Sequence, residues 1–552
     1  MNNRYLKQTT FMMVLLLVYN YTASVGIGYI NKYLPPAYQL DTSGISALLN
    51  DLKSNGLQYG MSMIGYFLVY LIFVILLITV VLHHYHQLHI KAWLRNIHRG
   101  KVYVWLFILL LILLPLNQFG MKVPVINHIP IPATFISMIS GTWIKLFAGV
   151  VYLGMLLIVF RLKDTTYYLI VADEKLKQAI KKSWYKNKHQ LLGNATLILW
   201  LIGQLLLTVG ILMVLQYCID YVGNLDISIA AANIFIACLT GILYFVTAQW
   251  LLMFTTSLTI RIDQKPSVSM QLLAVVAMIA TGGLSLSLAN RFMQKPATSQ
   301  LVMAHMGVTS DRDVQNAIEN LRKVSATKPD YVEIDIQHTK DGVYVLSHDA
   351  TIKATNGKKY KISQTNWEQL QKVTYQSNGK KIKVSNFGDY LNEANRLNQR
   401  LLVELKINSS ISNQELKDFM HQYGSAMQKN GAQLQSLNQN ALKRLAGYTD
   451  ITSGLLSPLN NTINRDKTNQ FYALEYSSVE PKTSQQAHQV DKKLYAWTVD
   501  GHTDIMTMYA YGVDGFITNE PKETRAYLKR IIQRPNYALV IWHSMLFAKT
   551  DF

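Results

Sequence analysis

Long apolar segments dominate residues 1–290, and they restrict the fold more than any other feature of the chain. A helix that crosses a bilayer needs about 20 mostly apolar residues, because its backbone N–H and C=O groups must be satisfied without water. Apolar runs of this kind occur near residues 11–30, 61–82, 102–116, 142–160, 194–217, 228–256 and 269–289. The sequence therefore predicts an α-helical transmembrane domain of about seven spans over residues 1–290.

Two parts of this half admit other interpretations. The third run is short, and its Pro115 indicates that the run ends near a face of the membrane. Residues 125–141 favour a re-entrant or interfacial segment, which we do not count as a span. The first run follows Arg4 and Lys7 and also fits a signal peptide, although its length and tyrosine content favour retention. Cleavage there would leave the topology of the later spans unchanged.

The charged residues between the runs predict the orientation, because cytoplasmic loops of membrane proteins are enriched in Lys and Arg. The N-terminus and every second connection are basic, through Arg4, Lys7, Lys91, Arg95, Arg99, Lys101, Arg161, Lys163, Lys175, Lys177, Lys181, Lys182, Lys186, Lys188, Arg261 and Lys265. The connections between them are poor in Lys and Arg. We predict a multi-pass plasma-membrane protein with its N-terminus in the cytoplasm and residues from 291 onward outside the cell.

The formal net charge of +20 is explained by the same enrichment of Lys and Arg in cytoplasmic loops. A nucleic-acid partner is not expected, because the sequence has no basic stripe interleaved with aromatic residues. Residues 166–190 fit either an amphipathic helix on the inner membrane surface or a solvated loop. The two cysteines, Cys218 and Cys238, exclude a disulfide framework. Lys145 and Asp220 lie near the ends of spans, so no chain of buried ionisable residues points to ion transport.

From residue 301 the pattern changes to short β-branched runs that alternate with amphipathic ones. Strands are predicted at "LVMAHMG", "YVEIDIQHT", "VYVLSH", "RLLVELKI", "AQLQSL", "SGLLS", "FYALEY", "LYAWTV" and "GFITN", and helices at "DVQNAIENLRKVSA", "NQELKDFMHQYG", "QNALKRLAGY", "DIMTMYAYG" and "PKETRAYLKRIIQ". About 230 residues of this alternation are typical of a (β/α)₈ TIM barrel. We predict a linker at 291–300, the barrel at 301–535 and a C-terminal tail at 536–552.

Polar residues stand at the ends of these strands, where the chemistry of such barrels is found. Glu333 and Asp335 share one face of their strand, as do Glu404 and Lys406 on theirs, because side chains two apart point the same way. Three converging carboxylates favour a hard divalent cation, Ca²⁺ or Mg²⁺. The strand-end histidines His305 and His348 suit general acid and base catalysis beside it. His338, Asp349 and Asp514 are assigned to turns or supporting positions.

The ordered set "AHMG", "AIEN", "DYVEIDIQHTKDGVYVLSHD", "LLVELK", "AWTVD" and "GVDGFITNEP" resembles the glycerophosphodiester phosphodiesterase family. The membrane half is similar to the multi-span, Gram-positive bacterial subgroup of that family. The resemblance implies metal-dependent hydrolysis of a glycerol-phosphate diester to an alcohol and glycerol phosphate. It implies that His305 and His348 act as base and acid, and that Lys406 contacts phosphate. It also implies that Glu333, Asp335 and Glu404 hold the cation, that Trp497 packs on the glycerol, and that Glu319 and Asn519 support the site.

One residue departs from the family pattern. Met306 stands where the family has an arginine that binds phosphate, and a thioether offers none of the bidentate contacts of a guanidinium. The departure fits a changed substrate, and it also fits a catalytically degenerate barrel kept as a membrane-anchored binding or sensor module. The substrates expected outside the cell are lipid-derived glycerophosphodiesters and polyglycerolphosphate of teichoic-type polymers. A third interpretation makes the membrane half a lipid-handling or transport unit that feeds the barrel.

Overall fold

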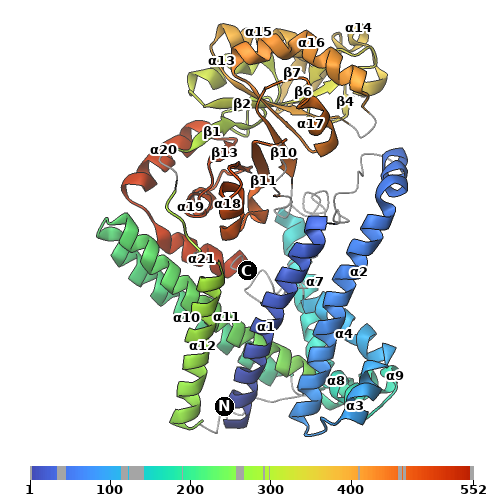
Figure 1. Cartoon of the computed structure of the whole chain (residues 1–552), viewed down its shortest axis with the longest axis vertical. Helices are drawn as coiled ribbons and strands as arrows, with labels where there is room; N and C mark the ends of the chain where they lie inside the picture. The colour runs from blue at the N-terminus through green and yellow to red at the C-terminus, as the bar shows by residue number, and fades with distance from the viewer. Residues whose placement is uncertain are drawn as a thin grey trace. The chain divides into compact units, whose positions relative to one another are not determined.

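The computed structural model describes residues 3–33, 45–113, 122, 142–188, 191–256, 266–289, 292–296, 299–407, 411–457, 463 and 468–547. The chain divides into two compact units (Figure 1). One unit is mainly Asn55–Phe292 with both ends of the chain, and the other is Met293–Val540 with Leu40–Ser54.

The first unit is helical, and each of the seven predicted apolar runs falls on a helix. These helices are α1 (Asn3–Tyr33), α2 (Ile45–His84), α4 (Gly100–Leu113), α7 (Thr142–Arg161), α10 (Leu191–Tyr221), α11 (Leu225–Thr256) and α12 (Val268–Ala289). Among the described residues five helices are long and apolar enough to cross a membrane, within α1, α2, α10, α11 and α12. A sixth span results if α3 (Ile90–Ile97) and α4, bent by 70°, count as one. Residues 125–141 lie outside the described part.

Close helix packing in this unit depends on small residues, because helices in a lipid environment gain from close backbone approach. A Cβ atom added at Gly282 of α12 would lie 2.1 Å from the carbonyl oxygen of Ala237 on α11. A Cβ atom at Gly241 of α11 would lie 2.1 Å from the carbonyl oxygen of Met278. Both contacts are far inside van der Waals distance, so these two glycines permit the pairing of α11 with α12.

The basic segment 166–190 forms two short helices rather than one, α8 (Thr165–Ile170) and α9 (Leu176–Lys186). Helix α9 is amphipathic, since Ala179 and Ser183 are buried while most of its lysines are exposed. Asp173, between the two helices, forms ion pairs with Arg99 and Lys101. Of the two interpretations left open for this segment, the amphipathic helix agrees with α9, and the break between α8 and α9 was not predicted.

The second unit contains a closed barrel of eight parallel strands, which confirms the predicted fold. Its order is β1 (Leu301–Ala304), β2 (Tyr331–His338), β8 (Leu401–Leu405), β9 (Gln433–Ser436), β10 (Ser453–Ser457), β11 (Phe471–Glu475), β12 (Lys493–Trp497) and β13 (Gly515–Thr518). β1 pairs with both β13 and β2, which closes the barrel. Inward-facing side chains such as Met303, Leu402, Phe471 and Tyr495 fill the interior.

Helices follow most strands and cover the barrel (Figure 1). They are α13 (Ile318–Ala326), α15 (Phe387–Arg396), α16 (Asn413–Asn430), α17 (Gln439–Leu445), α18 (Pro481–His488), α19 (His502–Ala510) and α20 (Pro521–Gln533); α21 (Tyr537–Phe547) comes last. The sequence did not reveal α15 or α18. Helix α13 begins later than predicted, because Asn316 has a left-handed backbone (φ 54°) that a helix cannot continue through.

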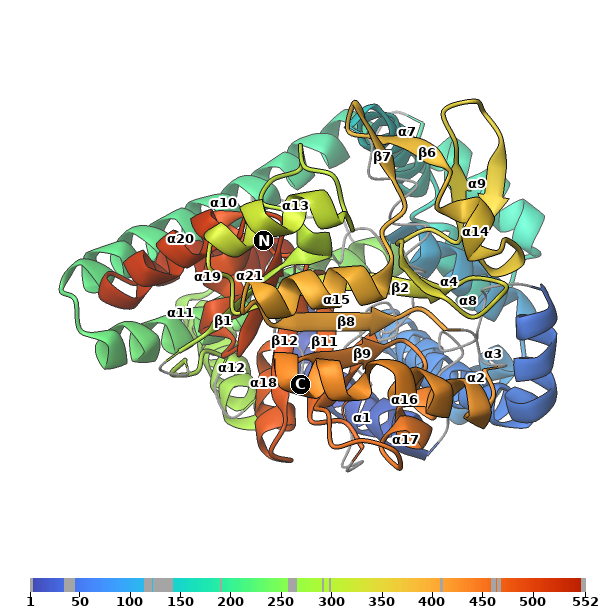
Figure 2. The same cartoon turned by 90° about the horizontal axis from the view of Figure 1, so that it is seen from above.

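The predicted strand "VYVLSH" does not belong to the barrel proper. It is β3 (Tyr344–Leu346), which pairs antiparallel with the end of β2. Two hairpins that the sequence did not predict follow it: β4 (Thr351–Lys353) with β5 (Lys359–Lys361), and β6 (Thr374–Ser377) with β7 (Lys380–Lys383). Short helix α14 (Trp367–Leu370) lies between them in the chain. Figure 2 shows the two hairpins and α14 together on one side of the barrel.

Candidate active site

Three buried carboxylates converge at the carboxyl ends of β2 and β8. Glu333, Asp335 and Glu404 are at most 5% exposed, and each offers an oxygen that lies within 4.8 Å of those of the other two. Strand register explains the convergence, because Asp335 is the direct partner of Glu404 on the neighbouring strand. Glu333 lies two residues before Asp335 on the same face. Like charges placed directly opposite destabilise a sheet, so this arrangement needs compensation.

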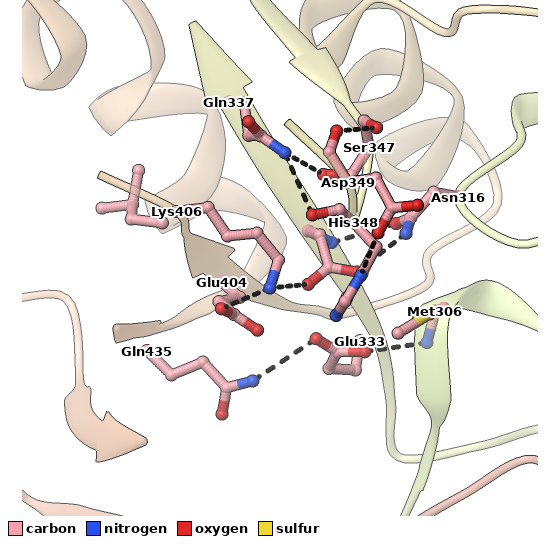
Figure 3. Close-up of polar contacts among 12 residues, drawn as sticks. Met306, Asn316, Glu333, Gln337, Ser347, His348, Asp349, Glu404, Lys406 and Gln435 are labelled. Carbon is pink, nitrogen blue, oxygen red and sulfur yellow. Dashed lines mark hydrogen bonds and ion pairs between the residues drawn. The ribbon is translucent and has the colours of Figure 1, made fainter. Parts of the chain in front are cut away.

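Lys406 supplies part of that compensation (Figure 3). Its Nζ lies 3.2 Å from Asp335 Oδ1 and 2.9 Å from Glu404 Oε1. Burial, followed by the charge of Asp335, raises the pKa of Glu404. Burial and the two neighbouring carboxylates also raise the pKa of Glu333. Burial opposes ionisation of Asp335 too, but the charge of Lys406 and several hydrogen bonds outweigh it and lower the pKa of that carboxyl.

The carboxylate oxygens of Glu333, Asp335 and Glu404 fit a divalent cation. Three carboxylates face one ammonium, so two negative charges lack a counterion when all three are ionised. Glu404 Oε1 is buried and near Lys406, yet it accepts no well-directed hydrogen bond within the described part of the chain. Oxygen atoms from carboxylates are the ligands that Ca²⁺ and Mg²⁺ prefer. Glu333, Asp335 and Glu404 could therefore hold such an ion, and its charge would balance theirs.

His305 lies at the end of β1, and a chain of hydrogen bonds fixes its tautomer. Asn519 donates through Nδ2 to Asp500 Oδ2 (2.9 Å), which leaves its Oδ1 as an acceptor only. That oxygen lies 2.8 Å from His305 Nδ1, so Nδ1 carries the proton and Nε2 keeps its lone pair. Burial lowers the pKa of His305, which favours the neutral, proton-accepting ring. Asp500 also accepts from the backbone N–H of Asn519 (2.7 Å).

Met306 contributes through its backbone. Its φ of 47° lies in the left-handed region, and its N–H donates to Glu333 Oε2 at 2.7 Å. Its carbonyl oxygen accepts from the backbone N–H of Asn316 (2.7 Å). Asn316 in turn donates from Nδ2 to Asp335 Oδ2 at 2.8 Å and accepts from the backbone N–H of Asp335 at 3.0 Å. The β1–α13 loop therefore holds two of the three carboxylates in place.

His348 follows β3, and its ring points towards the carboxylates in Figure 3. It is about half exposed, and its Nδ1 lies 2.9 Å from Asp349 Oδ1. The side chain of Gln337 donates to the backbone oxygens of Ser347 (2.9 Å) and His348 (3.1 Å) and steadies this turn. His305 and His348 thus reach the cluster from different strands, one half-buried and the other accessible to solvent.

Of the remaining predicted residues, Trp497 lies at the barrel mouth, whereas Glu319 and Asp514 make no contact with the carboxylates among the contacts described. Trp497 ends β12, and its indole N–H donates to the Ala473 carbonyl oxygen (3.1 Å), so the ring is held at the barrel mouth. Glu319, predicted to support the site, is exposed in the first turn of α13. Asn316, three residues earlier, makes the contact with Asp335 that a supporting residue would make. Asp514, assigned to a supporting position, pairs with His488 at 2.9 Å.

Sequence reasoning missed Asn316, Asp500 and Gln435. Gln435 on β9 is the register partner of Glu404, and its Nε2 donates to Glu333 Oε1 at 3.4 Å. A signal existed for Gln435, because it lies near the end of β9, a strand in which alternate residues face the barrel interior. Asp500 also lies just after a strand. Asn316 lies in a loop, and nothing in its spacing points to Asp335.

Two family models match the chain. Residues 305–523 match the glycerophosphoryl diester phosphodiesterase family, and residues 45–301 match the membrane domain of glycerophosphoryl diester phosphodiesterase. A curated relative, the glycerophosphodiester phosphodiesterase of Caldanaerobacter subterraneus subsp. tengcongensis, is 26% identical over 239 residues, which cover 40% of this chain and 95% of the relative.

Solved structures of the same kind are similar to the barrel. A glycerophosphodiester phosphodiesterase from Parabacteroides distasonis is 24% identical, with a TM-score of 0.37, and the match covers 43% of this chain and 99% of that one. An Oleispira antarctica phosphodiesterase in complex with the product sn-glycerol-3-phosphate is 16% identical, with a TM-score of 0.39, over 42% of this chain and 97% of that one. The two family matches confirm the resemblance drawn from the motifs. The chain is a membrane-embedded member of the glycerophosphoryl diester phosphodiesterase family and a phosphoric diester hydrolase.

Proposed function

We propose that the protein hydrolyses glycerol-phosphate diesters at the outer face of the membrane with the help of a divalent cation, Ca²⁺ or Mg²⁺. The observation that supports this most directly is the buried cluster of Glu333, Asp335 and Glu404, in which three carboxyl groups face a single lysine beside two histidines. A cation held there would stabilise negative charge on the phosphoryl oxygens. Lys406, already in contact with two of the carboxylates, would stabilise the same charge from the side of β8.

The two histidines divide the proton transfers between them. His305 presents an unprotonated Nε2, so it is suited to take the proton of a free glycerol hydroxyl as that oxygen attacks phosphorus. His348 would give a proton to the oxygen of the departing alcohol as the P–O bond breaks. In a second step water would open the cyclic phosphodiester, with the proton transfers reversed. Trp497 would pack against the glycerol.

The substrates we propose are lipid-derived glycerophosphodiesters and polyglycerolphosphate of teichoic-type polymers. The distribution of Lys and Arg between the apolar runs supports a barrel outside the cell and an N-terminus in the cytoplasm. The same proposal divides the chain into a membrane domain up to residue 290, a linker at 291–300, a barrel at 301–535 and a C-terminal tail. It also assigns the protein to a Gram-positive bacterium. Protease added to intact cells should cleave the barrel, and a fully protected barrel would overturn this orientation.

The chemistry is tested on the purified full-length protein with glycerophosphocholine as substrate. We expect glycerol phosphate to appear only with Ca²⁺ or Mg²⁺, and EDTA to abolish it. His305→Ala should lower the rate by about 10²–10⁴-fold, the usual contribution of a general base. A rate that survives EDTA, or one unchanged in His305→Ala, would overturn the mechanism. An inactive wild type that still binds the substrate would favour the alternative, a binding or sensor module, to which Met306 lends support.

A further inference from the structure

The two hairpins beside the barrel mouth carry a concentrated positive charge. Residues 351–385 contain eight lysines and a single acidic residue, Glu368. Glu368 forms an ion pair with Lys372 and so neutralises a lysine that lies outside the hairpins. Of the six exposed lysines of the paired strands, five make up what we call the lysine face: Lys353, Lys359, Lys361, Lys381 and Lys383.

Strand register places these lysines on the outer surfaces of the hairpins. Lys353 is the direct cross-strand partner of Lys359, while the alternate residues Ile352 and Tyr360 pack into an apolar cluster below. On the second hairpin Lys381 and Lys383 alternate with buried Ile382. Like charges placed directly opposite one another destabilise a hairpin. Lys353 and Lys359 are such a pair, and a bound anion would offset their repulsion.

The lysine face is attached to the catalytic end of the barrel at two places. The hairpins begin directly after His348 and Asp349. At the turn between β6 and β7, the Asn378 side chain donates to the backbone oxygens of Asp311 (2.9 Å) and Asp313 (2.6 Å). Those residues lie in the β1–α13 loop. The loop follows His305 and, through Asn316, holds Asp335.

Hydrophobic packing reinforces this attachment. Ile382 of β7 packs with Val314 and Ala317 of the β1–α13 loop, and Tyr375 of β6 joins the same cluster. The two hairpins are linked to each other by a bridge between Ala354 and Tyr375. The lysine-bearing strands therefore form one module with the β1–α13 loop that holds Asp335, and an anion bound on the lysine face would be held on this module.

We propose that the lysine face binds additional phosphates of a chain-like substrate, a polymer of phosphodiester-linked units, while one linkage occupies the catalytic site. This inference rests on the proposed hydrolysis of glycerol-phosphate diesters and narrows its substrate class. A single diester carries one phosphate, and Lys406 and the cation site suffice for it. Five further lysines on a module fixed to the pocket match a substrate with several phosphates in a row.

The test compares a long and a short substrate on the full-length protein in nanodiscs of zwitterionic lipid. The long substrate is polyglycerolphosphate, and the short one is glycerophosphoglycerol, which has one phosphodiester. The variant replaces the five lysines of the lysine face by glutamine. A matched control makes the same charge change at five exposed lysines of the other strands and helices, Lys417, Lys429, Lys493, Lys522 and Lys529. Activity on the short substrate also reports whether each variant folds.

We expect the lysine-face variant to lose at least about tenfold in kcat/KM on the polymer and less than about twofold on the short diester, with the control close to wild type. If all five lysines engage, counterion release predicts that wild-type affinity for the polymer falls roughly a hundredfold between about 50 mM and about 200 mM salt. That salt dependence should flatten in the lysine-face variant but not in the control.

Equal losses on both substrates, or none on the polymer, would overturn the inference. So would a loss seen only in nanodiscs that contain anionic lipid, since it would assign the lysine face to the bilayer. If the wild type cleaves neither substrate, the proposed function fails. In that case direct calorimetric binding of polyglycerolphosphate to wild type and variant still decides whether the lysine face holds a polyanion.

Discussion

Glu404→Gln removes one ionisable carboxyl group from the cluster and nearly preserves its shape. In the metal-free protein burial and neighbouring carboxylates raise the pKa of Glu333 and Glu404. Burial also opposes ionisation of Asp335, but the charge of Lys406 together with several hydrogen bonds outweighs it and lowers the pKa of that carboxyl. At a pH between the ordinary carboxyl pKa and the raised values, the cluster therefore holds two protons. A divalent cation must displace both to bind, because its ligands have to be ionised.

The expected magnitude follows from proton linkage. Each proton displaced makes the association constant rise tenfold per pH unit, which is about 1.4 kcal/mol. The wild type should therefore bind Ca²⁺ or Mg²⁺ up to about a hundredfold more tightly for each unit of rising pH, and Glu404→Gln only about tenfold. The dependence should level off once the pH exceeds the raised pKa values. The same shifts make the metal-free fold less stable as the pH rises through this window, and less steeply so in the variant.

The assay is titration calorimetry of the full-length protein with Ca²⁺ and with Mg²⁺ in two buffers that differ in ionisation enthalpy. The difference in heat gives the protons released, which we expect to be about two for the wild type and about one for Glu404→Gln. Glu319→Gln, a change at an exposed carboxylate on α13, should behave as the wild type. Binding that releases no protons, or equal release from wild type and Glu404→Gln, would refute the reasoning.

Three further predictions concern separate parts of the molecule. Asp500→Asn removes the carboxylate oxygen that accepts from Asn519 and so orients it. We expect kcat to fall by about 10²–10⁴-fold while calorimetry shows unchanged cation binding. Full activity would contradict the assignment of the proton to Nδ1 of His305. Met306→Ala should keep cation affinity, since the contact to the cluster is made by the backbone, whereas Met306→Arg should lower KM for phosphodiesters by roughly tenfold. Gly282→Ala should lower the melting temperature of the protein in detergent, because its Cβ meets a carbonyl oxygen, and Gly283→Ala, with open space, should not.

The local sequence pattern was sufficient to predict most of the helices and strands. Continuous apolar runs predicted seven of the helices of the membrane unit. The count of spans stayed approximate because α4 has only 14 residues and bends sharply from α3. Alternating strands and helices predicted the barrel. The pattern failed for residues 350–385, where short polar strands of two hairpins have no periodicity long enough to detect. The sequence predicted β3 as a strand but did not show that it lies outside the closed barrel, where it pairs antiparallel with the end of β2.

The sequence by itself determined which residue types were available for the chemistry. Glu333 and Asp335 had to share a face, because the side-chain period of a strand is two. Tertiary structure alone decided which residues meet across the barrel. Strand register aligns Asp335 with Glu404, and Glu404 with Gln435. A left-handed turn directs the Met306 N–H to Glu333, and Asn316 rather than the predicted Glu319 contacts the carboxylate cluster. Strand register and loop conformation depend on the packing of distant segments, and sequence spacing carries no record of that packing.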